Sequence, residues 1–226
     1  MVNLLIKMLP SVLRKQLKNF WILSKKYGQY GSIRQKKSLN AKNEVLPWYT
    51  YPAIEYLASL DFTESMVLEF GAGSSSVWWA GRSKSVLAVE HNKEWAETLQ
   101  EKIDNLHIVF ASTQSEYLNA GAGNRFDVVI IDGMWRQECV NLTRTLLNEN
   151  GIVILDNADW HPLAARSLRE ELNLLQVDFH GFGPINDYTW TTSIFFKRSF
   201  KCRSNTERLP QYSVGALKKV AEGQEN

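Results

Sequence analysis

The stretch VLEFGAGSSS (residues 67–76) decides the fold of this chain. An apolar run that ends at a glycine turn predicts a buried strand, and the serines that follow predict the start of a helix. Gly71 and Gly73 carry no side chain where the backbone has to turn sharply. A helix start offers backbone N–H groups to a carboxylate or a phosphate. The stretch therefore predicts an α/β domain with an anion-accepting turn after its first strand.

Strands and helices alternate beyond this turn. Apolar runs predict further strands at residues 85–90, 106–110, 126–132 and 151–156. Within residues 46–60 a helix is expected with Pro52 in its first turn. Further helices are expected at residues 92–104, 137–147 and 162–175. The last two apolar runs, 175–182 and 188–198, are too close for a parallel crossover and should pair antiparallel. We expect an α/β fold with a doubly wound, mostly parallel sheet of seven strands and an antiparallel last strand.

The composition divides the chain into three parts. Residues 1–45 are expected to form a basic amphipathic arm and linker, residues 46–200 a single domain, and residues 201–226 a polar tail. Within the arm, apolar residues at helical spacing predict an amphipathic helix with Ser11 as its cap. The polar stretch 27–43 is interpreted as a linker.

The net charge of +2 conceals an asymmetry between the arm and the domain. Residues 1–47 contain ten Lys or Arg and a single acid, Glu44, whereas the rest of the chain contains more acids than bases. Because basic arms attract anionic partners, we expect peripheral contact with an anionic membrane through residues 1–26. Nucleic acid is disfavoured, since the arm lacks a recognised nucleic-acid motif. The alternative is a helix that packs on its own domain or on a second subunit of a homodimer.

Several classes of protein do not fit this composition. No uninterrupted apolar run reaches the roughly 18–20 residues that a membrane-spanning helix needs, and no secretory signal precedes the domain. Two cysteines, Cys139 and Cys202, are too few for a disulfide framework. The expected location is the cytoplasm, with the arm at the inner face of the membrane.

Two acidic residues extend the signature of the glycine turn. Glu69 lies just before the turn, where a carboxylate would face a ligand's ammonium group. Glu90 ends the second predicted strand, where an acid accepts hydrogen bonds from both ribose hydroxyls. The joint pattern of strand, Glu-x-Gly-x-Gly, helix, strand and terminal acid resembles the first two motifs of class I S-adenosylmethionine-dependent methyltransferases, which have a Rossmann-like fold.

The resemblance implies which residues bind S-adenosylmethionine. The glycine turn would hold its methionine part, Glu90 its ribose, and His91 would lie beside the adenine. Ser112, after the third strand, would approach the polar edge of the adenine, where many members of the family have an acid. The expected cofactor-binding residues are Glu69, Gly71, Ala72, Gly73, Ser75, Glu90, His91, Ser112 and Asp132.

An NAD(P)-binding oxidoreductase is the nearest competing class. Its fingerprint is Gly-x-Gly-x-x-Gly, followed by the same ribose acid. This chain has Ser76 at the third glycine, and Glu69 would face a pyrophosphate of like charge. The pattern therefore favours the methyltransferase.

Acidic residues also end the fourth and fifth predicted strands. Neighbouring oxygen ligands at strand ends suit a hard cation such as Mg²⁺ or Mn²⁺. The spacing is similar to that of metal-dependent catechol-type O-methyltransferases, which implies Asp132, Asp156 and Asn157 as metal ligands. The alternative is that Asp132 caps the following helix and that Asp156 and Asn157 shape a turn.

The catalytic residues are less clearly marked. The metal-dependent enzymes place a Lys soon after the first Asp, whereas this chain has Arg136, which cannot act as a base but could hold an anionic acceptor. Asp132 would orient the acceptor. His161 is a candidate general base, and the alternative is a surface histidine at a helix start. Aromatic residues expected around the acceptor are Trp135, Trp160, Tyr188 and Trp190.

The expected function is methyl transfer from S-adenosylmethionine to an oxygen, or less readily a nitrogen, of a small-molecule or glycan-like acceptor. Much of the catalysis would come from holding donor and nucleophile in line. The alternative is a catalytically inactive S-adenosylmethionine-binding or scaffold protein, which the missing lysine suggests.

Overall fold

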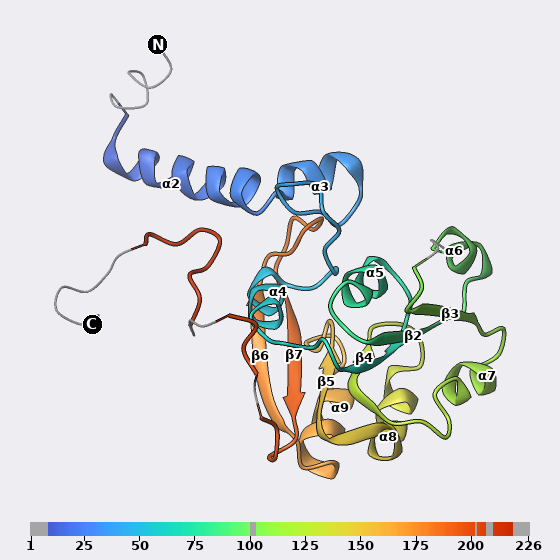
Figure 1. Cartoon of the computed structure of the whole chain (residues 1–226). Coiled ribbons are helices and arrows are strands. Elements are labelled where there is room, and N and C mark those ends of the chain that lie inside the picture. Colours follow the sequence, from blue (N-terminus) through green and yellow to red (C-terminus); the bar gives the residue numbers. More distant parts are fainter. Residues whose placement is uncertain (1–8, 100–102, 202, 207–209, 219–226) are drawn as a thin grey trace.

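The computed structural model describes residues 9–99, 103–201, 203–206 and 210–218. Seven strands form one sheet in the order β3-β2-β1-β4-β5-β7-β6 (Figure 1). The strands are β1 (Met66–Phe70), β2 (Ser85–Glu90), β3 (Leu106–Phe110), β4 (Phe126–Ile131), β5 (Leu147–Leu155), β6 (Leu175–Gly181) and β7 (Trp190–Phe196). Strands β1 to β5 pair in parallel, and β7 pairs antiparallel with both β5 and β6. The predicted sheet, including its antiparallel end, is confirmed.

Helices connect the strands and cover the sheet. The α-helices are α2 (Ser11–Trp21), α3 (Gln29–Gln35), α4 (Tyr51–Ala58), α5 (Ser74–Ala80), α6 (Lys93–Thr98), α7 (Gln114–Asn119), α8 (Arg136–Leu146) and α9 (Pro162–Arg166). Two short π-helices, η1 (Ile22–Lys26) and η2 (Ser167–Glu171), continue α2 and α9.

Alternate residues of the central strands enter two different hydrophobic cores. In β1, Val67 belongs to the core that includes residues of α4 and α5, whereas Leu68 and Phe70 belong to the core that includes residues of α7, α8 and α9. Successive side chains of a strand point to opposite faces, so both faces of the sheet are buried. This explains the nearly continuous apolar strands of the sequence.

Several element boundaries differ from the sequence-based expectation. The helix expected at 162–175 ends at Glu171, because Asn173 adopts a left-handed backbone with a φ of 53°. The helix expected at 92–104 is shorter than predicted, because α6 ends at Thr98 with Leu99 as its C-cap, and residues 100–102 of that range lie outside the described residues. Strand β5 begins at Leu147, four residues before the expected start at Gly151.

Helix α7 was not predicted, although the sequence carries a signal for it. The Thr113 side chain accepts a hydrogen bond from the Glu116 backbone N–H at 3.2 Å, and the Glu116 carboxylate accepts from the Thr113 N–H at 3.2 Å. This reciprocal pair is a capping box, and its Thr-x-x-Glu pattern marks a helix start.

The N-terminal segment contains more structure than a linker. The amphipathic helix is present as α2, but Ser11 is its first residue and not its cap, since Pro10 occupies the cap position without a side-chain hydrogen bond. Helix α3 lies within the stretch interpreted as a linker, and its Gln29 amide donates to the Gly183 carbonyl at 3.0 Å. This contact ties α3 to the loop between β6 and β7.

Within the described residues, no helix has the length and apolar character needed to cross a bilayer.

Candidate functional site

A cavity of about 650 Å³ opens where β1, β2 and β4 end. Its walls include residues 71–75 after β1, Glu90 and His91 at the end of β2, and residues 132–134 after β4. Ligands of open α/β sheets bind outside the carboxyl ends of the strands, and this volume suits a small ligand. Most of the predicted cofactor-binding residues therefore meet in one cavity.

The glycine turn rests directly on the loop that follows β4. Gly71 adopts a φ of +104°, which L side chains rarely tolerate. A Cβ added there would lie 2.6 Å from the Gly133 backbone nitrogen, which is shorter than real Cβ contacts. The sharp turn and the close approach of the two loops thus both require glycine at position 71.

Glu69 lies behind the turn and is fully buried. Its carboxylate accepts hydrogen bonds from the Ser75 and Ser76 hydroxyls, and the Ser76 hydroxyl also accepts from the Gly73 N–H at 3.0 Å. Glu69 is not among the residues that line the cavity. This placement favours a role in holding the glycine turn rather than direct contact with a ligand's ammonium group.

Burial raises the pKa of Glu69 to about 8, although the two serine hydrogen bonds lower it. The folded chain therefore binds this proton more tightly than the unfolded chain, in which the pKa is near 4.5. The stability that this preference contributes is complete below about pH 4.5 and is lost as the pH rises through about 8.

We expect the wild-type protein to lose stability relative to Glu69→Gln between about pH 5 and pH 8, by an amount on the order of a few kcal/mol. Urea unfolding without ligand, measured across this range, checks the difference. Glu64→Gln, at an exposed position in the turn before β1, is the control. If the free energies of unfolding of the wild type and Glu69→Gln change in parallel with pH, the raised pKa of Glu69 is refuted.

Glu90 presents a carboxylate to the cavity while it also shapes the loop after β2. Its Oε1 accepts from the backbone N–H groups of His91 at 2.9 Å and Asn92 at 2.8 Å, and lies 2.9 Å from Nδ1 of His91. Among the described residues none donates to Oε2. Oε2 is thus the acceptor that a ligand hydroxyl can use.

Of the two residues expected beside the adenine, His91 lies in the cavity wall and Ser112 does not. His91 lines the cavity together with Trp95, whose indole N–H donates to the Ala72 carbonyl at 2.8 Å. Ser112 does not line it, and its hydroxyl donates to the Glu116 carboxylate at 2.8 Å as part of the α7 cap. Trp95 was missed because a helical Trp alone does not show which loop it will contact.

Part of the cavity wall comes from the segment that precedes the domain predicted from the sequence. Residues 36–39 line the cavity together with Val45 and Trp48. A β-bridge between Leu39 and Val45 and a hydrogen bond from the Ser38 hydroxyl to the Pro47 carbonyl at 3.1 Å hold this wall. No local pattern in the sequence indicates this role.

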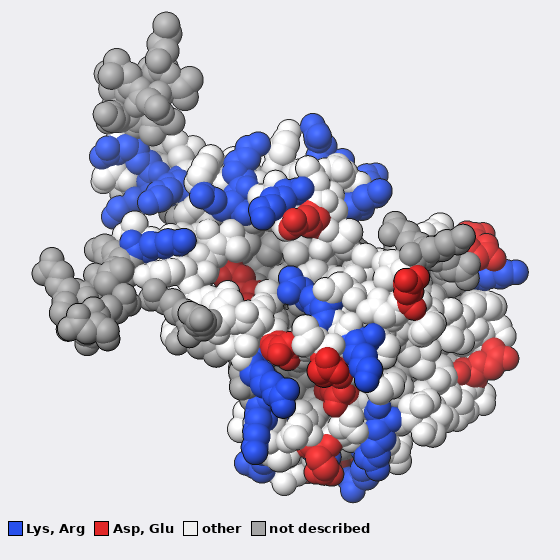
Figure 2. All heavy atoms as spheres, in the orientation of Figure 1, with Lys and Arg blue, Asp and Glu red and all other residues white. Residues whose placement is uncertain are grey.

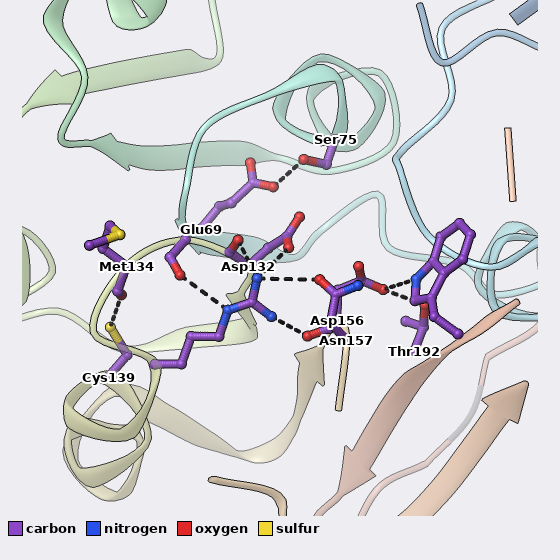
Figure 3. A network of polar contacts seen from close by, with 11 residues as sticks. Glu69, Ser75, Asp132, Met134, Cys139, Asp156, Asn157 and Thr192 are labelled. Atoms are coloured by element: carbon purple, nitrogen blue, oxygen red, sulfur yellow. Dashed lines mark hydrogen bonds and ion pairs between the residues drawn. The ribbon is translucent and has the colours of Figure 1, made fainter. Parts of the chain in front are cut away.

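Arg136 joins the two acidic strand ends, where Figure 3 labels Asp132, Asp156 and Asn157. Its guanidinium donates to the Asp132 carbonyl at 2.8 Å, to the Asp132 carboxylate at 3.2 Å and to the Gly133 carbonyl at 3.1 Å. The same group donates to the Asp156 carbonyl and, at 3.4 Å, to the Asn157 side chain. These bonds engage the fork of the guanidinium, so the structure does not support the expected clamp on an anionic acceptor.

The side chains of the expected metal ligands already bind other groups of the protein. Asp156 is buried, and its Oδ1 accepts from the Trp190 indole at 3.1 Å and from the Thr192 hydroxyl at 2.5 Å. The guanidinium of Arg136 lies between Asp132 and Asn157 and supplies the positive charge there. Among the described residues no cluster of His, Cys, Asp and Glu suits a metal. This donor set, as arranged, does not fit a divalent cation.

Asp132 remains the acidic residue of this network that reaches the cavity. It lines the cavity, and its side chain is 22% exposed. Burial raises its pKa to about 6, while the neighbouring Arg136 guanidinium lowers it. The paired guanidinium favours the ionised form of Asp132, which can accept a hydrogen bond.

His161 occupies the position before helix α9, as the alternative interpretation expects. Its pKa is lowered by burial and by the charge of Arg136. It does not line the cavity. The geometry therefore gives no direct support to His161 as the general base.

The aromatic residues expected around the acceptor separate into two groups. Trp160, Tyr188 and Trp190 form a chain of ring contacts, with centroids 6.3 Å and 6.1 Å apart. Trp135 instead packs against Tyr117, at 5.1 Å, at the start of α8. Only the first group keeps exposed rings, those of Trp160 and Tyr188.

The fold matches solved methyltransferase structures. A precorrin-6y C5,15-methyltransferase from Geobacter metallireducens aligns with a TM-score of 0.54 at 16% identity, covering 65% of this chain and 87% of that chain. A putative caffeoyl-CoA O-methyltransferase from Staphylococcus aureus aligns with a TM-score of 0.55 at 15% identity, covering 83% and 100%. Trm5b from Pyrococcus abyssi aligns with a TM-score of 0.47 at 16% identity, covering 64% and 46%, so this chain spans about half of its length.

No protein-family model matches the chain, and no curated protein matches it. The chain has the Rossmann-like fold of S-adenosylmethionine-dependent methyltransferases, and the resemblance inferred from the sequence is confirmed at the level of the fold. In the NAD(P)-binding Rossmann sheet the strand order is 3-2-1-4-5-6, so the fifth and sixth strands are neighbours. In this chain the antiparallel strand β7 lies between β5 and β6.

Proposed function

We propose that the chain is an S-adenosylmethionine-dependent methyltransferase that acts on an oxygen of a small-molecule or glycan-like acceptor. The single observation that carries the proposal is the cavity in which the glycine turn, the Glu90 carboxylate and Asp132 meet. The first two are suited to a donor nucleoside with an amino-acid tail. Asp132 is suited to an acceptor hydroxyl.

The donor end of the cavity offers matching chemistry. Backbone N–H groups at the start of α5 suit the carboxylate of the amino-acid tail, and Oε2 of Glu90 suits a ribose hydroxyl. His91 and Trp95 supply flat walls on which an adenine can stack. S-adenosylmethionine would supply an electrophilic methyl group on its sulfonium.

The acceptor end lies beside Asp132 and Met134, with Trp48 and Ile185 as apolar walls. An acceptor hydroxyl that donates to Asp132 would turn its lone pairs toward the donor and become more nucleophilic. Arg136 holds the Asp132 carboxylate at 3.2 Å, which fixes its direction. In-line positioning of donor and nucleophile supplies much of the rate of such a displacement.

Glu90→Ala is expected to weaken S-adenosylmethionine binding by about 1–3 kcal/mol, because buried ribose hydroxyls would lose their acceptor. Calorimetry with S-adenosylmethionine and S-adenosylhomocysteine measures the change. Glu90→Gln keeps an oxygen for the His91 and Asn92 N–H groups and separates loop distortion from the loss of charge. Glu97→Ala, on the exposed side of α6, is the control. No binding by the folded wild-type protein at millimolar ligand would remove the proposal.

Turnover distinguishes the enzyme from an inactive binding protein. Transfer of a labelled methyl group to a panel of phenols, catechols and oligosaccharides tests the acceptor class. Asp132→Asn should then abolish transfer and leave S-adenosylmethionine binding within about twofold. Binding without transfer to any acceptor would favour the scaffold alternative instead.

A further inference from the structure

Helix α2 exposes an apolar face to solvent. None of its residues is buried, and its large apolar side chains are between 41% and 69% exposed. These side chains are Val12, Leu13, Leu17, Phe20 and Trp21. Figure 1 shows α2 extending away from the sheet, so the helix contributes little to the core of the domain. Exposed apolar patches of this kind mark contact sites.

The opposite side of α2 is basic. With 3.6 residues per turn, Lys15 and Lys18 lie on the side away from the apolar residues, and Arg14 lies at the edge of the apolar face. Lys25 and Lys26 follow in η1, and Figure 2 shows Lys and Arg side chains gathered over α2 and α3. The first 43 residues contain no Asp or Glu, so nothing within this segment neutralises the charge.

This charge decides between the partners that could cover the apolar face. In a two-fold dimer through the apolar face, the basic sides of both helices would point outward, and nothing in the partner's equally basic helix would neutralise them. A nucleic acid would satisfy the charge but would leave the apolar side chains in water. An anionic lipid surface satisfies both, because its acyl region accepts the apolar face and its headgroups attract the basic face.

We propose that α2 binds the protein peripherally to anionic membrane surfaces, lying in the interface with its apolar face toward the acyl chains. Trp21 supports this orientation, since Trp is favoured at the membrane interface and the Lys26 ammonium lies 5.5 Å from its ring centroid. This surface is separate from the methyl-transfer cavity, whose walls contain no residue of α2.

Co-sedimentation of the full chain with vesicles tests the proposal. We expect binding to vesicles of phosphatidylcholine mixed with phosphatidylserine, weak binding to phosphatidylcholine alone, and loss of binding at high salt. Leu17→Gln with Phe20→Gln removes apolar contacts, and Lys15→Glu with Lys18→Glu reverses charge. Each pair should lower partitioning by about tenfold or more.

Matched controls lie elsewhere on the surface. Leu163→Gln replaces an apolar side chain on α9 that is 71% exposed, and Lys84→Glu with Lys93→Glu makes the same charge change on the domain. These variants should bind vesicles as the wild type does. All variants should bind S-adenosylmethionine equally, so a failure of this proposal and a failure of the proposed function are distinguishable.

Three results would overturn the proposal. The first is recovery of the wild-type protein in the supernatant with anionic vesicles. The second is a dimer, seen by analytical ultracentrifugation, that Leu17→Gln with Phe20→Gln dissociates without any effect on vesicle binding. The third is binding to a homopolymer RNA that this apolar pair leaves unchanged while vesicles are not bound.

Discussion

Arg136→Ala is expected to abolish methyl transfer and to lower the free energy of unfolding by about 3–5 kcal/mol, the usual cost of leaving a buried charge unpaired. In the wild-type protein the guanidinium neutralises Asp132 at 3.2 Å and donates to backbone carbonyls of both strand-end loops. Without it, the carboxyl groups of Asp132, which lines the cavity, and of buried Asp156 lose the cation that offsets their mutual repulsion. Urea unfolding and a labelled-methyl assay measure the two losses.

Arg136→Lys separates the effect of charge from that of geometry, and Arg166→Ala is the control. Arg136→Lys keeps a positive charge but not the planar fork, so we expect an intermediate loss of stability. Arg166→Ala removes an exposed arginine whose ion pair with Glu170, at 2.8 Å, should be worth less than about 1 kcal/mol. If Arg136→Ala lowers the free energy of unfolding by no more than Arg166→Ala does, Arg136 does not stabilise the two strand ends as we infer.

The position of Arg136 also predicts how activity responds to metal removal. Because the guanidinium already supplies a cation between Asp132 and Asn157, the wild-type rate should persist after exhaustive chelation. A rate that falls on chelation and returns with Mg²⁺ or Mn²⁺ would restore the metal-ligand assignment of Asp132, Asp156 and Asn157.

Gly71→Val is expected to lower the affinity for S-adenosylmethionine by at least about a hundredfold and to destabilise the fold. Valine would have to adopt a φ of +104°, and its Cβ would lie 2.6 Å from the Gly133 nitrogen. The glycine turn and the loop after β4 would have to separate, and both line the cavity. Calorimetry and thermal unfolding measure the two effects.

Gly123→Val isolates the contribution of backbone strain. Gly123 also has a positive φ, +80°, but a Cβ added there meets nothing within 4 Å. We expect this variant to lose about 1–3 kcal/mol of stability and to bind S-adenosylmethionine normally. Equal losses of affinity in both valine variants would show that strain, and not the contact between the two loops, explains the effect of Gly71→Val.

The strands and their order of appearance could be predicted because their signal is local. An apolar run such as 126–131 remains a buried strand wherever the sheet places it, and Gly71 permits a sharp turn that other residues resist. Helix ends were predicted less well. The end of η2 depends on the left-handed conformation of Asn173, which composition alone does not reveal.

The site was predicted in part for the same reason. Glu90 and the glycine turn reach the cavity because the ends of parallel strands must share one edge of the sheet. Ser112 follows a strand in the same way, but a local capping box with Glu116 engages its hydroxyl and leaves it outside the cavity wall. A strand-end position therefore brings a residue to the edge without deciding where its side chain goes.

The sequence by itself determined the fold class, the antiparallel end of the sheet, the glycine turn and the amphipathic character of α2, since each depends on neighbouring residues or on a short period. Only the tertiary structure decided that residues 36–39 form part of the cavity wall, that Glu69 lies behind the turn, and that Arg136 lies between two acidic strand ends. Arg136 and Asn157 are far apart along the chain, and they meet only because β4 and β5 are neighbours and α8 begins at their shared edge. Contacts of this kind depend on sheet order and packing, which no local pattern encodes.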